Sequence, residues 1–217
     1  MKRAPSLLAL VALVGCQSTY YAAWEKMGWH KRDILVDRVE DARDAQDEAK
    51  EQFVSALDQF KAVTSFDGGN LEAQYKKLSS AYDSAKTRAD EVTARIKSVD
   101  DVATALFKEW EAEIDQYQSA QLKTASQQQL RATKDRYGKL LSAMRAAESK
   151  MQPVLAAFHD QVLFLKHNLN AAAIASLQDT AVSIERDVAT LIRDMETSIN
   201  EANAFIDQMQ KEQPATG

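Results

Sequence analysis

Histidine and cysteine are scarce in this chain, which limits the chemistry that its side chains can perform. The histidines are His30, His159 and His167, and Cys16 is the single cysteine. A di-iron helical bundle needs two inward-facing Glu-x-x-His pairs, and no glutamate here has a histidine three residues after it. No His-Glu-x-x-His zinc motif is present either. We therefore expect no metal site, no cofactor and no enzymatic activity.

The other groups that could do catalysis or bind phosphate fit a structural role better. His159 precedes Asp160, which could orient a proton carrier, but no nucleophile or second histidine stands beside this pair. Gly68-Gly69 lacks the Lys-Ser/Thr that follows in a phosphate-binding loop. Acidic and basic residues alternate, as in Asp37-Arg38 and Arg43-Asp44. Such alternation is typical of solvated helix faces with ion pairs one turn apart.

The composition favours a helical protein with a packed core. Of the 217 residues, 45% are hydrophobic and 27% are charged, and the formal net charge is −5. Six glycines and three prolines are too few for a fold that is rich in tight turns. Nucleic-acid binders normally carry a basic field, so the negative charge argues against that function. The length suggests one domain, or at most two small ones, and we expect an all-α fold.

The first sixteen residues resemble the leader of a bacterial lipoprotein. Residues 1–3 begin with a short basic stretch, and residues 4–14 are an apolar run too short to span a bilayer. Leu13-Val14-Gly15-Cys16 resembles the lipobox, in which the cysteine is acylated and becomes the mature N-terminus. We predict that residues 1–15 are a signal peptide and that Cys16 is lipidated. An ordinary signal peptide with an incidental cysteine is the alternative.

The residue after the cysteine bears on where the protein is anchored. In enterobacterial lipoproteins an aspartate at this position retains the protein in the inner membrane, and here the residue is Gln17. By that analogy we expect an anchor in the outer membrane, facing the periplasm. Inner-membrane anchoring stays open, because the sorting rule varies among bacteria.

Four aromatic residues follow the predicted anchor within the segment 16–30. They are Tyr20, Tyr21, Trp24 and Trp29. Amphipathic aromatic rings favour the headgroup zone of a membrane, which predicts that this segment contacts the membrane surface. Lys26, Lys31 and Arg32 would then meet anionic headgroups. The alternative is that the aromatic rings cap the open end of the helical domain.

Apolar residues recur at alternating spacings of four and three through residues 31–211. This spacing is the pattern of a coiled-coil-like seam. Interruptions at 66–70, 122–126 and 167–170 divide the pattern into four long segments. The sequence therefore predicts an elongated up-down four-helix bundle, followed by a disordered tail at 212–217. A helical hairpin that dimerises has the same periodicity, so a homo-oligomer stays open.

Individual residues refine these expectations. Asn70 is predicted to cap the second helix, and Thr124 or Ser126 to cap the third. Pro153 lies inside the third helix and predicts a kink rather than an end. The apolar stretch from Phe158 through Leu163-Phe164-Leu165 is expected to be the most enclosed part of the core.

Function rests on two hypotheses from different classes. The first is a non-enzymatic, lipid-anchored envelope protein that acts as a helical scaffold or interaction module for a protein partner. Its candidate partner-contact residues are His167, Asn168 and Asn170, although an internal turn explains them equally well. The second is a binder of an apolar small molecule or lipid, with the bundle interior opened near Pro153 and Phe158.

Five stretches of the chain carry a resemblance to a known family. They are Tyr20-Tyr21 with Trp24-Glu25-Lys26 and Gly28, His30–Leu35, Leu106–Glu111, Pro153-Val154-Leu155, and Leu163–Ala173. Together they resemble a family of bacterial lipoproteins, mostly from marine gammaproteobacteria, defined only as a domain of unknown function. The resemblance runs from about Tyr20 to Met209. It implies an envelope location and a helical domain, and it brings no activity, cofactor or catalytic residue.

Overall fold

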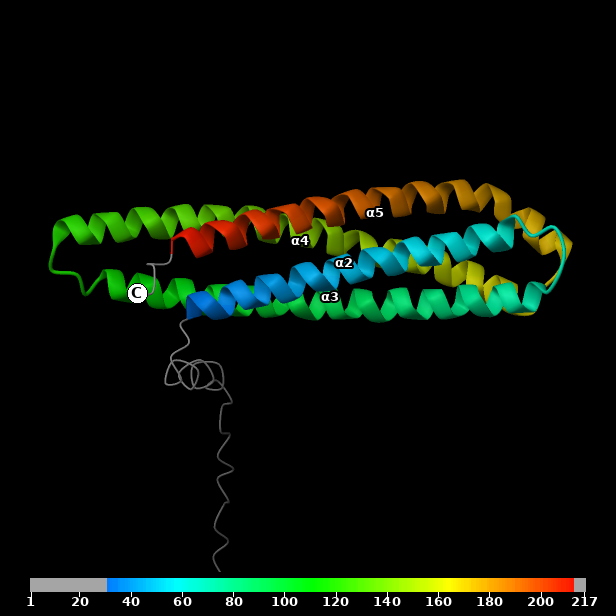
Figure 1. The fold of residues 1–217 in the computed structure, drawn as a ribbon, viewed down its shortest axis with the longest axis horizontal. Coiled ribbons are helices and arrows are strands. Elements are labelled where there is room, and N and C mark those ends of the chain that lie inside the picture. The colour runs from blue at the N-terminus through cyan, green and yellow to red at the C-terminus, as the bar shows by residue number, and fades with distance from the viewer. Residues whose placement is uncertain (1–30, 213–217) are drawn as a thin grey trace, which may run out of the picture.

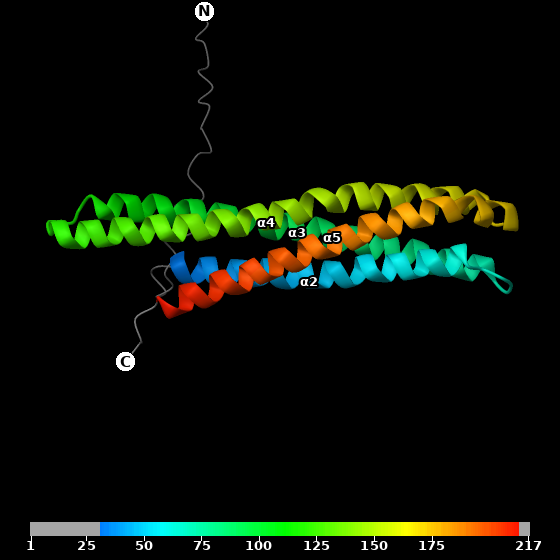
Figure 2. The same cartoon turned by 90° about the horizontal axis from the view of Figure 1, so that it is seen from above.

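The computed structural model describes residues 31–212 as a set of long helices. They are α2 (Lys31–Thr64), α3 (Leu71–Ile114), α4 (Ala120–His167) and α5 (Ala171–Lys211). No strand occurs in this part of the chain. Figures 1 and 2 show an elongated rod in which consecutive helices run in opposite directions. The 48 residues of α4 give the rod a length of about 70 Å, at 1.5 Å per residue. The expected all-α class is confirmed.

Each helix packs against two neighbours. The main contacts of α2 are with α3 and α5, and those of α4 are with the same two helices. In this arrangement the apolar face of each helix points toward the central axis of the bundle. None of the helices within residues 31–212 is long and apolar enough to cross a membrane.

The residues at the alternating four-three spacing form the core. The large side chains that are wholly buried include Phe53, Phe60, Phe158, Leu78, Leu140, Met144, Leu191 and Met195. The rings of Phe60 and Phe158 meet edge to face, with their centroids 6.1 Å apart. Alanines at seam positions such as Ala49 and Ala85 are also fully buried. Their small side chains leave room for neighbouring helices to approach closely, which keeps the rod thin.

The turn between α2 and α3 has the structure that its residues predict. Gly68 and Gly69 adopt φ angles of +152° and +108°, in the region that L-residues with side chains avoid. Asn70 then caps α3, because its side-chain oxygen accepts a hydrogen bond from the Ala73 N–H at 3.0 Å. Asn170 does the same for α5, with the Ala173 N–H as donor at 3.0 Å. These side chains satisfy amide groups that the first turn of a helix otherwise leaves unpaired.

The expected cap of α4 is wrong. Ser119 is the N-cap residue, and its hydroxyl accepts from the Leu122 N–H at 3.4 Å. Thr124 lies inside the helix, where its hydroxyl donates to the Ala120 carbonyl one turn back. Threonine residues inside helices often make this bond. Ser126 instead accepts a hydrogen bond from the indole N–H of Trp110 on α3, at 2.9 Å. The lapse in apolar spacing therefore marks a polar helix face and not a helix start.

The apolar stretch after Pro153 is less enclosed than its composition suggests. The helix α4 continues through Pro153 without ending there. Phe158, Val162 and Leu165 are buried, but the side chain of Leu163 is 51% exposed and that of Phe164 is 40% exposed. The expectation of full enclosure is wrong because helical spacing turns residues 163 and 164 away from the face that holds Phe158 and Leu165.

One polar pair lies inside the core between α2 and α5. Gln46 and Ser198 are both 0% exposed, and the Ser198 hydroxyl donates to the Gln46 side-chain oxygen at 2.7 Å. The Gln46 amide nitrogen has no hydrogen-bond partner among the residues described. Because burial without a partner is costly for a polar group, the pair favours the one α2–α5 register in which the two side chains meet.

Three charged residues tie the chain ends of the bundle together. Glu212 accepts hydrogen bonds from Arg32 at 3.0 Å and from Arg136 at 2.7 Å. Burial opposes ionisation of this carboxyl group, but the Gln208 hydrogen bond and the two arginine charges outweigh it and lower the pKa of Glu212. Glu212 therefore belongs to the folded body, although the sequence placed it in the disordered tail. Residues 213–217 lie outside the described residues.

Candidate functional site

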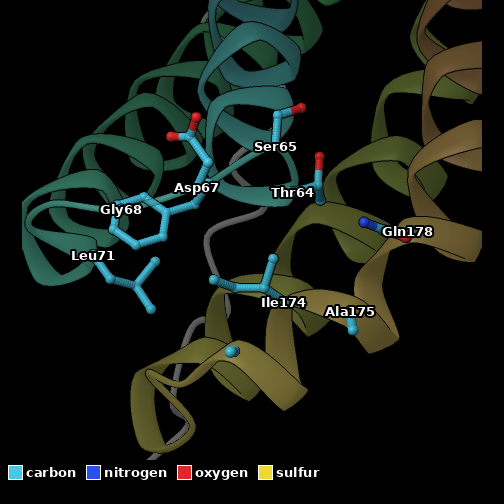
Figure 3. A pocket seen from close by; sticks show the side chains of 10 residues that line it. Thr64, Ser65, Asp67, Gly68, Leu71, Ile174, Ala175 and Gln178 are labelled. Atoms are coloured by element: carbon cyan, nitrogen blue, oxygen red, sulfur yellow. The ribbon is translucent and has the colours of Figure 1, made fainter.

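A cleft opens at the end of the rod where the α2–α3 turn meets the start of α5 (Figure 3). Its cavity volume is about 470 Å³. We call it the tip cleft, and it is lined by Thr64, Ser65, Phe66, Asp67, Gly68, Leu71, Ala171, Ile174, Ala175 and Gln178. Figure 3 shows Leu71 and Ile174 approaching the space from its two sides. The site thus combines segments that are about a hundred residues apart in the sequence.

One wall of the tip cleft is formed by the end of α2 and the turn that follows it. Thr64 closes the last turn of α2, with its hydroxyl donating to the Lys61 carbonyl at 3.1 Å. The backbone then leaves the helix, and the positive φ angle of Gly68 turns it back toward α3. Open space surrounds the position where a Cβ atom on Gly68 would stand. The conformation of the turn, and not steric crowding, therefore requires glycine there.

The opposite wall is one face of the first two turns of α5. Ala171, Ile174, Ala175 and Gln178 follow spacings of three, one and three, which places them on one side of the helix. The Asn170 cap fixes the point at which α5 begins. Three of these four side chains are apolar, so this wall offers a small hydrophobic surface to the cleft.

The lining of the tip cleft combines apolar side chains with a few polar groups. Its polar groups are hydroxyls, the Asp67 carboxylate and the Gln178 carboxamide, and no histidine, lysine or cysteine lines it. The arrangement can accept apolar side chains against Leu71 and Ile174 while the polar rim offers hydrogen bonds.

Exposed apolar side chains are concentrated at the same end of the rod. Of the seven large hydrophobic side chains that are exposed within residues 31–212, four fall between residues 163 and 182. They are Leu163, Phe164, Leu169 and Val182, with exposed fractions between 38% and 71%. We call these four residues the tip patch. Single exposed hydrophobic residues are ordinary, whereas a group of them at one end of a molecule is a candidate contact surface.

The predicted partner-contact residues occupy the turn between α4 and α5. His167 is the last residue of α4, and its side chain is exposed. Asn168 donates from its side chain to the Phe164 carbonyl at 2.9 Å, and Asn170 caps α5. The structure thus brings all three to the tip, next to the cleft but outside its lining. The two asparagines hydrogen-bond within the turn, and the exposed His167 lies beside them.

Sequence reasoning missed the lining of the tip cleft. Leu71 and Ile174 belong to the apolar spacing and were assigned to the core, although Leu71 is only partly buried. Phe66 was seen only as part of a turn. The available signal was the position of Phe66, two residues before the paired glycines. An aromatic residue in such a turn lies outside the apolar spacing of the helices, so its ring does not belong to the core pattern.

The remaining chemistry-bearing groups among residues 31–212 have structural surroundings. The Tyr137 hydroxyl donates to Asp100 at 2.8 Å, and burial together with this hydrogen bond raises the pKa of Tyr137. His159 is exposed, with its ring 5.6 Å from that of Tyr82. No three potential metal ligands gather anywhere in this part of the chain.

The other predicted site residues lie outside the residues that the structure describes. They are the lipidation candidate Cys16 and the membrane-contact candidates Tyr20, Tyr21, Trp24 and Trp29. Both predictions remain open.

Comparison with known proteins gives one match. The chain has no match among curated proteins or solved structures. Residues 20–209 match the family DUF2959, which is described as a protein of unknown function. This match includes all of α2, α3 and α4 and nearly all of α5. The chain therefore belongs to the DUF2959 family of proteins of unknown function.

Proposed function

We propose that this protein is a non-enzymatic, lipid-anchored cell-envelope protein that acts as a helical interaction module. In this proposal residues 1–15 are a cleaved signal peptide, and acylated Cys16 holds the chain in the outer membrane on the periplasmic side. The partner is an envelope protein that presents apolar side chains to the tip cleft and the tip patch. The observation that carries the proposal is the concentration of exposed apolar residues at this end of the rod.

The placement of the two ends supports this reading. The described chain begins at Lys31, at the end of α2 opposite to Thr64, which lines the tip cleft. The 34 residues of α2 separate these points by about 50 Å, at 1.5 Å per residue. A tether that enters at Lys31 would leave the tip patch free to reach a partner well away from the anchor.

The same proposal includes an up-down four-helix bundle whose seams pack in the manner of a coiled coil. The alternating four-three spacing of buried residues supports it. A bundle of this kind keeps a fixed length, which suits a spacer between a membrane and a partner.

The partner contact can be tested with one charge substitution and a matched control. Leu169→Glu places a carboxylate in the tip patch, and Val54→Glu places one on an exposed position of α2 (42% exposed). Crosslinked cells that carry each variant are compared by affinity purification. We expect Leu169→Glu to lose a partner that the wild type and Val54→Glu retain. Equal recovery with all three chains would contradict a contact at the tip.

The anchor is tested separately. The intact mass of the mature protein should correspond to a chain that begins at an acylated Cys16, and the protein should fractionate with outer membranes. The Cys16→Ala variant should lose the lipid mass. An unmodified chain that retains residues 1–15 in the cytosolic fraction would contradict the proposal.

Binding of an apolar small molecule is the second candidate, and the volume of the tip cleft favours it. About 470 Å³ lies in the range of small-ligand sites. Near Phe158, where the sequence suggested an opening, the core is filled by the Phe60–Phe158 contact. Native mass spectrometry of the purified chain distinguishes the candidates. A co-purifying ligand that is lost in Ile174→Glu supports a binder, whereas an unliganded mass removes its support.

A further inference from the structure

The outward side of α4 carries a second row of regularly spaced residues, opposite to the side that packs in the core. The helix runs from one end of the rod to the other (Figure 2), and its core residues, such as Phe158 and Leu165, are buried. On the outward side, exposed residues recur at spacings of three and four, which keeps them on one face of the helix. They are Gly138, Ser142, Ala146, Ser149, Pro153, Ala156, Asp160, Leu163 and His167. We call this set the α4 outer face.

The α4 outer face is poor in charge, unlike the outward side of α2. Asp160 is its one acidic residue, and it contains no lysine, arginine or glutamate. The exposed residues of α2 include six acidic ones, which are Asp37, Asp44, Asp47, Glu48, Glu51 and Asp58. A helix face that meets water is normally polar and charged. The α4 outer face therefore has the composition of a surface that another helix covers.

The two halves of this face differ in bulk. Leu163 is 51% exposed, and Phe164, at the edge of the face, is 40% exposed. Both lie in the half toward the tip cleft. The half toward the middle of the rod holds only small side chains between Gly138 and Ser149. Large and small side chains on facing surfaces can interdigitate, so each half is suited to pack against the other.

Gly138 has no role inside the bundle that explains it. Its backbone is helical, and among the described residues nothing lies within 4 Å of the place where its Cβ would stand. Glycine in a helix interior is less favourable than alanine. A glycine of this kind on an exposed face suits the close approach of a neighbouring molecule.

The bulky half and the small-residue half meet when two copies of the chain lie antiparallel. If the pair is centred between residues 154 and 155, Leu163 and Phe164 of one copy come opposite Ala146 of the other. Gly138 of one copy then comes opposite the connection between α4 and α5 of the other. The pairing is reciprocal, as a two-fold symmetric interface requires. The same register therefore matches both ends of the face at once.

Small side chains occupy the centre of this pairing. Pro153 of one copy comes opposite Ala156 of the other, so the two helices can approach closely there. Ser149 adds no unpaired donor, because its hydroxyl donates to the Ala146 carbonyl of its own helix at 2.9 Å. Covering the face therefore costs little in hydrogen bonds lost to water.

The charges on α4 are compatible with the antiparallel arrangement. Asp160 of one copy comes opposite Ser149 of the other, one turn away from Arg145 of that copy. Arg145 already pairs with Asp100 at 2.6 Å, and a guanidinium has further donors for a second carboxylate. No acidic residue of one outer face comes opposite an acidic residue of the other. Two chains of net negative charge can thus approach each other through this face.

We propose that the protein forms an antiparallel homodimer in which the α4 outer faces of two copies pack against each other. The paired stretch from Ser142 to His167 is about 38 Å long, at 1.5 Å per residue. The dimer covers Leu163 and Phe164 of the tip patch and leaves Val182 and the tip cleft to the envelope partner. It does not rest on the proposed function, because it needs neither the anchor nor that partner.

The mass of the purified chain in solution tests the dimer. Sedimentation equilibrium is run on the chain from residue 17 onward, which contains all four helices and no cysteine. We expect it to be largely dimeric at about 100 µM. A chain that stays monomeric at this concentration would overturn the proposal.

One charge substitution and a matched control locate the interface. Ala146→Glu places a carboxylate opposite Leu163 and should raise the dissociation constant at least about tenfold. Ala94→Glu, the same change at an exposed position of α3, should raise it less than about twofold. Both positions are exposed, so far-UV circular dichroism should show both variants folded. Equal dissociation constants for the two variants would overturn a contact through the α4 outer face.

Disulfide crosslinking tests the orientation of the two copies. A mixture of Ala146→Cys and Leu163→Cys chains should give a disulfide-linked dimer on oxidation, because these positions come opposite each other. Each variant alone should give little, since the two copies of residue 146 lie about 25 Å apart along the axis, far beyond the reach of a disulfide. Efficient crosslinking of either variant alone would indicate a parallel pair and contradict the proposal. So would a mixture that forms no crosslink.

Discussion

The buried pair of Gln46 and Ser198 permits a quantitative test of how the bundle is specified. Ser198→Ala removes the hydroxyl that donates to the Gln46 side-chain oxygen at 2.7 Å. Both residues are 0% exposed, so water does not replace the lost donor. The Gln46 amide nitrogen already lacks a partner among the described residues, and the substitution leaves the whole carboxamide unpaired.

The expected cost follows from that geometry. A buried polar group without a partner costs about 1–3 kcal/mol, so Ser198→Ala should lower the free energy of unfolding by that amount. The reciprocal variant Gln46→Met places an apolar side chain of similar shape in the core, and the remaining hydroxyl can donate to a carbonyl of its own helix. The double variant removes both polar groups and should be about as stable as the wild type or more stable.

Urea unfolding, followed by far-UV circular dichroism, measures these free energies on the chain from residue 17 onward. The coupling energy of the double-mutant cycle should be at least about 1 kcal/mol. In thermal unfolding, Ser198→Ala should lower the midpoint by about 2–4 °C per kcal/mol. A Ser198→Ala variant as stable as the wild type would refute the assignment. So would a double variant that is destabilised as much as Ser198→Ala alone.

Three further predictions concern the core, the first turn and the charged cluster. Phe158→Ala should cost about 3–5 kcal/mol in urea unfolding, because the Phe60 ring loses its edge-to-face partner, and a loss below 1 kcal/mol would contradict that packing. Gly69→Ala should cost about 1–2 kcal/mol from backbone strain alone, since φ is +108° and no atom lies within 4 Å of the added Cβ; unchanged stability would show that the turn relaxes. The lowered pKa of Glu212 stabilises the fold above the ordinary carboxyl value of 4.5, and this contribution is lost as the pH falls through the lower folded-state pKa. Glu212→Gln should therefore reduce the thermal midpoint at neutral pH but have little effect near pH 2, and a difference that persists in acid would contradict the ionic origin.

The helical segments were predictable because local signals agree with the long-range pattern. Paired glycines followed by Asn70 predict a turn with positive φ angles and then a helix cap. Both features are present in the structure. The apolar spacing also continues without interruption through Ser98 and Asp101, and α3 is correspondingly a single helix.

The start of α4 was harder to predict, because several polar residues there can cap a helix. Ser119, Thr124 and Ser126 are equivalent candidates by residue type alone. What distinguishes them is tertiary: Ser126 is held by the Trp110 indole, and a contact between α3 and α4 cannot be read from either helix separately.

The tip cleft could not have been predicted from local patterns. It depends on the α2–α3 turn lying beside the first turns of α5, and the periodicity of each helix does not specify which turns become neighbours. The exposure of Leu163 and Phe164 was accessible in principle, because only every third or fourth residue after Phe158 can face the core. The prediction of full enclosure relied on the total apolar content of this stretch, which does not say which side of the helix each residue occupies.

Site-specific photocrosslinking along the rod tests most directly whether the tip is where this protein meets its partner. A photoreactive phenylalanine is placed, one position at a time, at Val54, Leu122, Leu163, Leu169 and Val182, all of which are exposed. Irradiation of intact cells should give a protein adduct at Leu163, Leu169 and Val182, and little or none at Val54 and Leu122. An adduct strongest at Val54, or no adduct at any tip position, would contradict an interaction module that works through its distal end.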